Sequence, residues 1–200
     1  MRGRVSKERR PSRCIHPVDM HASARYLGRM PSASATLRNP AATAALVVAL
    51  AGIAAIVGAW IFQYGFGYAP CPLCLEQRIP YYVAIPLGVI VAFAAARGAP
   101  RALVTGGLVV LLLAMLIGLV LAVYHAGVEW KWWPGPQDCS GPLNPLGSRG
   151  LMDQLQNISI VRCDEAAWRF LGLSLAGYNV LISLALAGVA AWGIKAVRRA

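Results

Sequence analysis

Long uninterrupted runs of apolar residues dominate the hydrophobic pattern of this chain. Four runs without a charged residue cover residues 41–62, 79–96, 102–124 and 170–194. An α-helix needs about 20 apolar residues to cross a hydrocarbon layer of about 30 Å, and the second run reaches that length if its helix spans residues 73–96. Backbone groups in lipid must be satisfied within their own segment, so we interpret the four runs as transmembrane helices.

Composition supports a membrane protein. Hydrophobic residues make up 58% of the 200 residues and charged residues 14%, and the mean hydropathy is +0.56. Soluble globular domains carry about 25% charged residues. We therefore expect an all-α integral membrane protein, a four-transmembrane-helix bundle with one long loop between the third and fourth helices. The membrane domain should cover residues 39–200, with loops 63–72 and 125–169 on the side opposite the termini.

The distribution of Lys and Arg predicts how the chain lies in the membrane. Fourteen of the 19 basic residues fall in residues 1–38, in the link 97–101 or in the tail 195–199. The other five lie with six of the eight acidic residues on the opposite side. Because positive charge favours the cytoplasm, both termini should be cytoplasmic. Four tryptophans near the opposite interface fit an aromatic belt: Trp130, Trp132, Trp133 and Trp168.

The segment ahead of the first apolar run has a different character. Residues 1–38 hold nine basic and two acidic residues, are rich in Ser, Ala and Pro, and show no apolar periodicity. We interpret them as a basic, disordered cytoplasmic tail that is dispensable, or not made if translation begins at Met20 or Met30. The formal net charge of +11 would suit nucleic acid, but no binding motif or interleaved aromatic residues accompany it. We expect the lipid bilayer, and no nucleic acid, as a partner.

The cysteines are distributed unequally across the predicted membrane. Cys14 falls in the cytoplasmic tail, whereas Cys71, Cys74, Cys139 and Cys163 all fall on the far side. Four thiols in an oxidising compartment predict two disulfides, with three possible connectivities. The simplest arrangement pairs the two members of the C-x-x-C at 71–74 and the two loop cysteines.

The two predicted bridges carry different expectations. A bridge between Cys139 and Cys163 could equally staple the loop or take part in redox chemistry. A bridge between Cys71 and Cys74 closes too small a loop to add much stability, whereas C-x-x-C pairs are a recurrent redox device. A zinc site of all four thiols would need reduced thiolates, which an oxidising compartment disfavours, so we expect no metal.

The residues around the C-x-x-C add candidate chemistry. If a helix begins at Cys71-Pro72, both sulfurs lie at its N-terminus, where the helix dipole favours a thiolate. Spacings of three and four residues place Cys71, Cys74 and Arg78 on one stripe of that helix. Arg78 could snorkel to the lipid headgroups, or stabilise the Cys74 thiolate or an oxyanion on a lipophilic electron acceptor. His125 ends the third run at the same depth and, taken alone, reads as an interfacial histidine.

A redox-active thiol pair needs an acceptor for two electrons. The sequence has no C-x-x-C-H haem motif, no glycine motif for a dinucleotide and no flavin signature. We therefore expect an acceptor dissolved in the bilayer, of which a quinone is the obvious example.

The ordered set of these features resembles the bacterial disulfide bond formation protein B (DsbB) family over about residues 43–194. The resemblance rests on C-P-L-C-L-E-Q-R ending at Arg78, Tyr124-His125, the loop cysteine Cys139, and Cys163 followed by W-R-F-L-G-L. Members of this family reoxidise the periplasmic thiol oxidase DsbA and pass the electrons to ubiquinone or menaquinone. The resemblance implies a multi-pass bacterial inner-membrane enzyme with periplasmic redox cysteines, a DsbA-like partner and a quinone acceptor.

The resemblance also implies a role for each site residue. Its catalytic residues would be Cys71, Cys74, Cys139 and Cys163. DsbA would attack Cys139 of a Cys139–Cys163 disulfide, and the electrons would then pass to the C-x-x-C. Cys74 would reduce the quinone, with Arg78 and His125 beside a quinone oxygen as binding residues.

Two alternatives remain at this point. A vitamin K epoxide reductase-like thiol oxidase also acts on quinones, but in that family the C-x-x-C follows the loop cysteines, whereas here it precedes them. A non-enzymatic four-helix membrane protein with structural disulfides would bind no quinone and would be insensitive to loss of Arg78.

Overall fold

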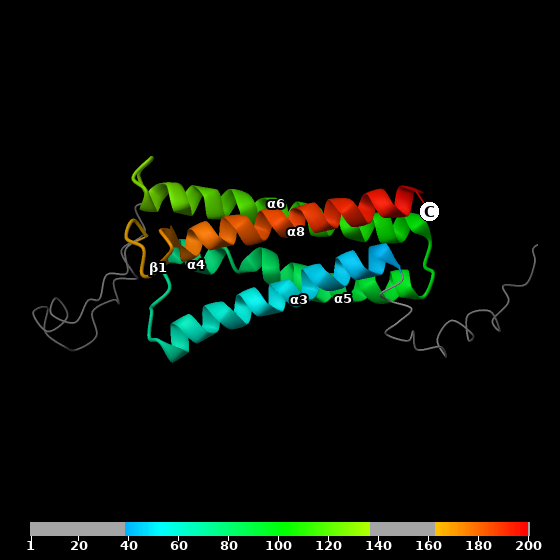
Figure 1. The fold of residues 1–200 in the computed structure, drawn as a ribbon, viewed down its shortest axis with the longest axis horizontal. Coiled ribbons are helices and arrows are strands. Elements are labelled where there is room, and N and C mark those ends of the chain that lie inside the picture. The colour runs from blue at the N-terminus through cyan, green and yellow to red at the C-terminus, as the bar shows by residue number, and fades with distance from the viewer. Residues whose placement is uncertain (1–38, 137–162, 200) are drawn as a thin grey trace, which may run out of the picture. The chain divides into compact units, whose positions relative to one another are not determined.

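A computed structural model describes residues 39–136 and 163–199 (Figure 1). Cys14, Cys139 and the whole of the expected tail 1–38 lie outside the described residues. The chain forms long helices, one π-helical turn and a short hairpin, in this order: α3 Pro40–Trp60, η1 Ile61–Gly65, α4 Pro72–Glu76, α5 Ile79–Ala96, α6 Arg101–Glu129, β1 Arg169–Phe170, β2 Leu173–Ser174 and α8 Leu175–Arg199.

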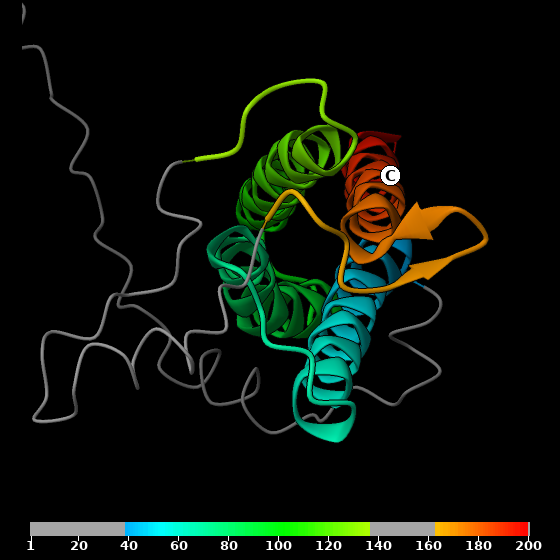
Figure 2. The ribbon, with the colours of Figure 1, turned by 90° about the vertical axis from the view of Figure 1, so that its left-hand side faces the viewer.

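The expected four membrane helices are confirmed. Within the described residues, four helical segments are long and apolar enough to cross a membrane: Pro40–Gly65, Pro72–Ala96, Arg101–Glu129 and Leu175–Arg199. Viewed along the bundle, the helices follow the cyclic order α3, α5, α6, α8, and each packs against its two neighbours (Figure 2). The chain is therefore a membrane-spanning helical bundle.

Small residues line the contacts between helices at the end of the bundle where α3 begins. A Cβ atom on Gly88 of α5 would lie 2.8 Å from the backbone oxygen of Ala45, and one on Gly193 of α8 would lie 2.7 Å from Cβ of Ala44. In lipid, small residues allow helix backbones to approach closely and so gain van der Waals contact. Outward-facing side chains are large and apolar, and several are more than half exposed: Leu50, Ile90, Leu103, Val120 and Leu184. Such a surface suits lipid and not water.

The second membrane segment is interrupted within residues 73–96, over which we expected one continuous helix. Helix α4 ends at Glu76, a turn covers Gln77 and Arg78, and α5 starts at Ile79. Pro80 has no N–H with which to bond the Glu76 carbonyl, so one helical hydrogen bond that would join α4 to α5 is missing. The turn is closed instead by a hydrogen bond of 3.1 Å from the Arg78 N–H to the Leu75 carbonyl.

Two expected helix ends differ from the structure. The third helix was expected to end at residue 124, but α6 continues to Glu129, and Val128 and Glu129 are buried against the rest of the bundle. The fourth was expected to start at Phe170, but the segment before α8 forms the antiparallel hairpin β1–β2, with Phe170 opposite Leu173. Leu171 and Gly172 form its turn with positive φ angles of 50° and 83°. These apolar hairpin residues extend the hydrophobic run without being helical.

Candidate functional site

The structure gathers three of the four predicted redox cysteines at one end of the bundle. Cys71 precedes α4, Cys74 lies within it, and Cys163 comes from the segment after the undescribed part of the long loop. Cys71 and Cys163 are 4% and 1% exposed and belong to one buried cluster with Leu73 and Val128, against which Cys74 packs. Residues about 90 positions apart in the chain thus meet beside the C-x-x-C.

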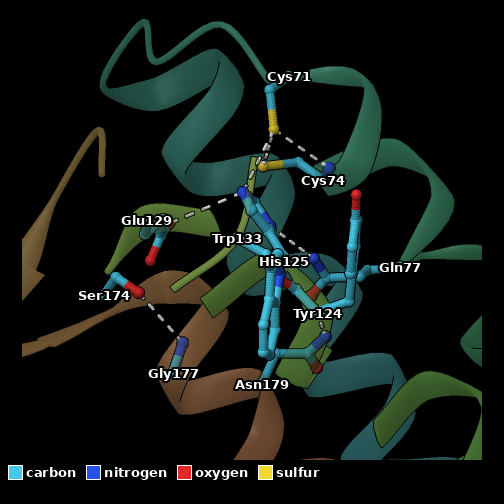
Figure 3. Close-up of polar contacts among 10 residues, drawn as sticks. All are labelled: Cys71, Cys74, Gln77, Tyr124, His125, Glu129, Trp133, Ser174, Gly177 and Asn179. Atoms are coloured by element: carbon cyan, nitrogen blue, oxygen red, sulfur yellow. Dashed lines mark hydrogen bonds and ion pairs between the residues drawn. The ribbon is translucent and has the colours of Figure 1, made fainter. Parts of the chain in front are cut away.

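Cys71 and Cys74 are held in position by the start of α4 (Figure 3). Cys71 is the N-cap residue, and its Sγ accepts a hydrogen bond of 3.3 Å from the Cys74 N–H. Pro72 occupies the first helical turn, where a missing N–H costs nothing. Both cysteines are reduced, and the Cys71 thiol donates to Cys74 Sγ over 2.9 Å. A disulfide of about 2.05 Å therefore needs only a small shift of the two sulfurs.

The Cys71 thiol holds its proton strongly. The hydrogen bond to Cys74, followed by burial, raises the pKa of the Cys71 thiol to about 12, and the nearby His125 opposes this shift without reversing it. The expectation that the helix N-terminus would favour a thiolate therefore does not apply to Cys71. In the dithiol state, Cys71 remains a thiol at neutral pH.

His125 lies against the sulfurs and not at a free interface. Its ring is 3% exposed, and Nε2 lies 3.7 Å from Cys71 Sγ. The same Nε2 lies 3.7 Å from Oε1 of Glu129. On the other side of the ring, Nδ1 lies 2.6 Å from the amide nitrogen of Gln77. An amide NH₂ can only donate, so Nδ1 accepts and the neutral ring carries its proton on Nε2.

Cys71, Cys74 and His125 also have the chemistry of metal ligands. The ligand atoms of Cys71, Cys74 and His125 all lie within 4.8 Å of one another, a spacing that sulfur and imidazole ligands of zinc could adopt. A metal ligand, however, needs a free lone pair on Nε2, and the hydrogen bond from Gln77 leaves the ring proton at that atom. The donor set favours a hydrogen-bond donor at this position over a metal ligand.

A chain of polar side chains runs from His125 across the bundle interior. The Gln77 carbonyl accepts from the Asn179 amide at 2.6 Å, and the Asn179 carbonyl accepts from the Tyr81 hydroxyl at 2.6 Å. Tyr81 in turn lies 3.1 Å from the hydroxyl of Ser183. None of these four residues was predicted from the sequence as part of the site. The available signal was their position, because isolated polar residues within apolar spans are rare and usually functional.

Arg78 is hydrogen-bonded to the end of the first membrane segment. Its Nη1 donates to the side-chain carbonyl of Gln63 over 2.8 Å, which ties the turn after α4 to the η1 end of α3. Arg78 nevertheless lines the same cavity as Cys74. A cation is therefore present in the wall of the cavity, and Gln63 of η1 orients it.

The cavity beside these residues has a volume of about 560 Å³. Its polar residues gather near the sulfurs, and its other walls include small apolar residues of α3 such as Ala51, Ala54 and Ala55. The polar lining residues include Cys71, Cys74, Gln77, Arg78, His125 and Glu129. A largely apolar cavity with a few convergent polar groups is typical of a small-molecule site.

The segment that carries Cys163 is attached to the bundle by surface contacts. Lys131, just after α6, forms an ion pair with Asp164. Trp168 packs against the rings of Phe62 and Phe170, which links this segment to the end of α3. The ion pair is partly exposed and adds at most about 1 kcal/mol, so aromatic packing and the burial of Cys163 position the segment.

Comparisons with known proteins give a consistent result. The family model for disulfide bond formation protein DsbB matches residues 41–193. A disulfide bond formation protein B of Aromatoleum aromaticum is 34% identical over 130 residues, covering 64% of this chain and 75% of that protein. The corresponding protein of Xylella fastidiosa is 31% identical over 140 residues, covering 66% and 78%. An uncharacterized protein of Rickettsia prowazekii is 28% identical over 144 residues, covering 70% and 80%. No solved structure matches this chain.

Proposed function

Because this chain belongs to the disulfide bond formation protein B (DsbB) family and has four membrane helices, we propose that it is a thiol oxidase. It reoxidises a DsbA-like partner and passes the electrons to a membrane quinone. The observation that carries this proposal is the position of the Cys71–Cys74 pair. The pair lies at the wall of a largely apolar cavity inside a membrane bundle. The family match over residues 41–193 favours this activity over the vitamin K epoxide reductase-like alternative.

The proposed electron path uses two disulfides in series. A reduced DsbA-like protein attacks Cys139 of the Cys139–Cys163 disulfide, and Cys163 leaves as a thiol. The second thiol of the partner then attacks the mixed disulfide, which releases the oxidised partner and leaves Cys139 and Cys163 as two thiols. Exchange with the Cys71–Cys74 disulfide then re-forms the loop disulfide and leaves the C-x-x-C reduced. The burial of Cys163 in one cluster with Cys71 supports this exchange, because the sulfurs must come into contact.

The second half of the reaction is the oxidation of the C-x-x-C. A quinone accepts the two electrons and two protons that the Cys71–Cys74 dithiol loses, and leaves as a quinol. Residues at the polar end of the cavity suit binding at the quinone oxygens, because Arg78 carries a positive charge and His125 presents an N–H. The small residues of α3 leave room for an apolar ring.

We also propose the location and orientation of the chain. It lies in the bacterial inner membrane with both termini in the cytoplasm and Cys71, Cys74, Cys139 and Cys163 in the periplasm, as the excess of Lys and Arg beside the termini favours. A membrane-impermeant maleimide applied to reduced intact cells should label Cys139 and spare Cys14. Labelling of Cys14 under these conditions would contradict the orientation.

A reconstituted assay tests the function directly. The purified protein in lipid nanodiscs is mixed with a reduced DsbA-like protein and a short-chain ubiquinone or menaquinone, and quinone absorbance is followed together with free thiols. We expect one quinol for each DsbA disulfide formed. If the folded protein exchanges thiols with its partner but never reduces either quinone, the proposed acceptor is wrong.

A further inference from the structure

Glu129 is a buried carboxyl group with no role in the electron path described above. It is the last residue of α6, is 7% exposed and lines the same cavity as Cys74 and Arg78. Its Oε1 faces His125 Nε2 at 3.7 Å, and within the described part of the chain its Oε2 has no hydrogen-bond partner (Figure 3). Burying a carboxylate is costly unless it is paired, so an incompletely paired one beside reactive sulfurs is a candidate for proton transfer.

The hydrogen-bond chain excludes neutral His125 as the base for the Cys71 thiol. The Asn179 carbonyl accepts from Tyr81, which leaves its amide to donate to the Gln77 carbonyl. The Gln77 amide then donates to His125 Nδ1, so the ring proton resides on Nε2. Each hydrogen bond of this chain is therefore donated toward the cysteines. His125 therefore presents an N–H to Cys71 and has no free lone pair with which to take the thiol proton.

One N–H of His125 thus faces two groups that can carry negative charge, Cys71 and Glu129, each 3.7 Å away. A single donor stabilises an anion on either of them, and a proton moving from the Cys71 thiol to the Glu129 carboxylate leaves the total charge unchanged. Among the described residues, the other ionisable groups around this position include Cys74, Cys163, Arg78 and Glu165.

We propose that Glu129 accepts the proton of Cys71 when the C-x-x-C is oxidised and delivers it to the electron acceptor in the cavity. The inference rests on the proposed function. The Cys71 and Cys74 S–H bonds break, one S–S bond forms, and a quinone takes both electrons and both protons to become a quinol. One proton travels by way of the Glu129 carboxylate, which is ionised again at the end. Gln77, Tyr81 and Asn179 are positioning residues that hold His125 in its donor tautomer.

Single-turnover kinetics test the role of Glu129. The protein is reduced at the C-x-x-C, freed of reductant and mixed with a short-chain ubiquinone across a pH series. We expect Glu129→Gln to slow quinone reduction by about 10²-fold or more and to flatten its pH dependence, because general acid–base catalysis typically contributes about 10²- to 10⁴-fold. The quinone concentration at half-maximal rate should change less than about threefold. Glu129→Asp should recover part of the rate.

Glu76→Gln is the matched control, since Glu76 is acidic and lies in the same short helix as Cys74 but is exposed and does not line the cavity. It should retain the wild-type rate and pH profile. A Glu129→Gln protein that does the same overturns the role of Glu129. A wild-type protein that cannot reduce quinone at all overturns the proposed function instead, so the two failures are distinguishable.

The tautomer supplies a test that does not depend on activity or on the folding of a Glu129 variant. Nitrogen-15 spectra of the reduced wild type should show His125 protonated on Nε2 and unprotonated on Nδ1. Asn179→Asp should reverse this, because a carboxylate accepts from both Tyr81 and Gln77 and leaves the Gln77 carbonyl to accept from Nδ1–H. A wild-type ring protonated on Nδ1 alone would overturn the argument, because Nε2 would then be free to act as the base.

Discussion

The two halves of helix α3 make different contacts with the same neighbouring helices. Between Ala41 and Ala49 the helix buries small side chains against α5 and α8, and Asn39 both caps α3 and donates to the Ala95 carbonyl of α5. Residues of α3 between Ala51 and Ala59 line the cavity, and the helix continues into the π-helical turn η1. In Figure 1 the η1 end of α3 lies apart from α6 and α8.

This difference shows how one bundle can be both stable and reactive. Close contacts of Ala and Gly hold the helices together at the end of the bundle where α3 begins, here called the packed end. The neighbouring side chains there are apolar. The other end contains the reduced cysteines, the cavity and a polar chain whose members would be costly to bury without one another. Substitutions at the two ends should therefore change different measured quantities.

The largest effect is expected for Cys74→Ser at the cavity end. A hydroxyl cannot form a disulfide with Cys71, so catalytic oxidation of the DsbA-like protein with quinone should fall by at least about 10³-fold. Thermal stability should stay close to wild type, because serine is nearly isosteric with cysteine. Exchange between the partner and the loop disulfide should persist as a half-reaction in a stopped-flow assay. Sustained turnover would show that the C-x-x-C is not on the electron path.

The reverse pattern is expected for Gly88→Val at the packed end. The new side chain would meet the Ala45 backbone oxygen, so we expect a loss of about 1–3 kcal/mol in the free energy of unfolding, measured in detergent micelles. The apparent KM for quinone in the folded fraction should not change. Gly58→Val is the control, since no heavy atom lies within 4 Å of a Cβ at that position. Equal losses in both variants would show that the packed end is not specially tight.

Arg78→Ala should raise the apparent KM for quinone by roughly tenfold, because a hydrogen bond from a charged donor is worth about 1.5–3 kcal/mol. The KM for the DsbA-like protein should change little, and Arg78→Lys should recover only part of the effect. Arg97→Ala is the matched control, because Arg97 lies at the opposite end of the same membrane segment and stacks on Phe93. Loss of affinity for the DsbA-like protein, with normal use of quinone, would contradict the role of Arg78.

The pKa of Cys71 predicts how its reactivity changes with pH. With a pKa of about 12 in the dithiol, its thiolate fraction and alkylation rate should rise about tenfold per pH unit from pH 7 to pH 10 without levelling off. Cys74→Ala removes the hydrogen bond that is the main cause of the raised pKa, so alkylation of Cys71 at pH 8 should become faster. Mass spectrometry of the alkylated peptide measures both rates. A plateau below pH 9 in the wild type would contradict this assignment.

The smallest effect is expected from deleting residues 2–38, which lie outside the described residues. Oxidase activity should remain within a few fold of wild type, since the segment has no apolar periodicity and its single cysteine lies on the proposed cytoplasmic side. The basic residues in the link 97–101 and the tail 195–199 should still orient the chain. A correctly inserted protein that cannot oxidise its partner would show that the tail is required.

Sequence patterns predicted the membrane helices well and their ends less well. The apolar runs identified all four spans, and the resemblance to the DsbB family is confirmed. The helix ends that were predicted wrongly have causes that a hydrophobicity pattern does not reveal. Pro80 interrupts the second segment, and the apolar residues around Leu171 form a hairpin turn instead of a helix. Extension of α6 to Glu129 depends on burial against other segments, which a run of residues does not reveal.

The polar part of the site was predicted only where a motif marked it. Cys71, Cys74 and Arg78 belong to one short motif, and the pairing of this motif with His125 came from the resemblance. Tyr81 and Asn179 are 98 residues apart, and Gln77 and Asn179 are 102 apart. Their hydrogen bonds depend on the rotation of α5 and α8 about their axes, and periodicity along one helix cannot determine this.

The sequence by itself determined that this chain enters a membrane as four helices, because the cost of placing unpaired backbone groups in lipid depends only on the length and polarity of each local segment. Only the tertiary structure decided which side chains meet inside the bundle. Close packing of α3 alanines against Gly88 of α5 and Gly193 of α8 positions these helices at one end, and the cavity and the polar chain occupy the other. Glu129, His125 and the cysteines acquire their chemistry there because hydrogen bonds and proton transfer require contact within a few ångströms, whatever the separation along the chain.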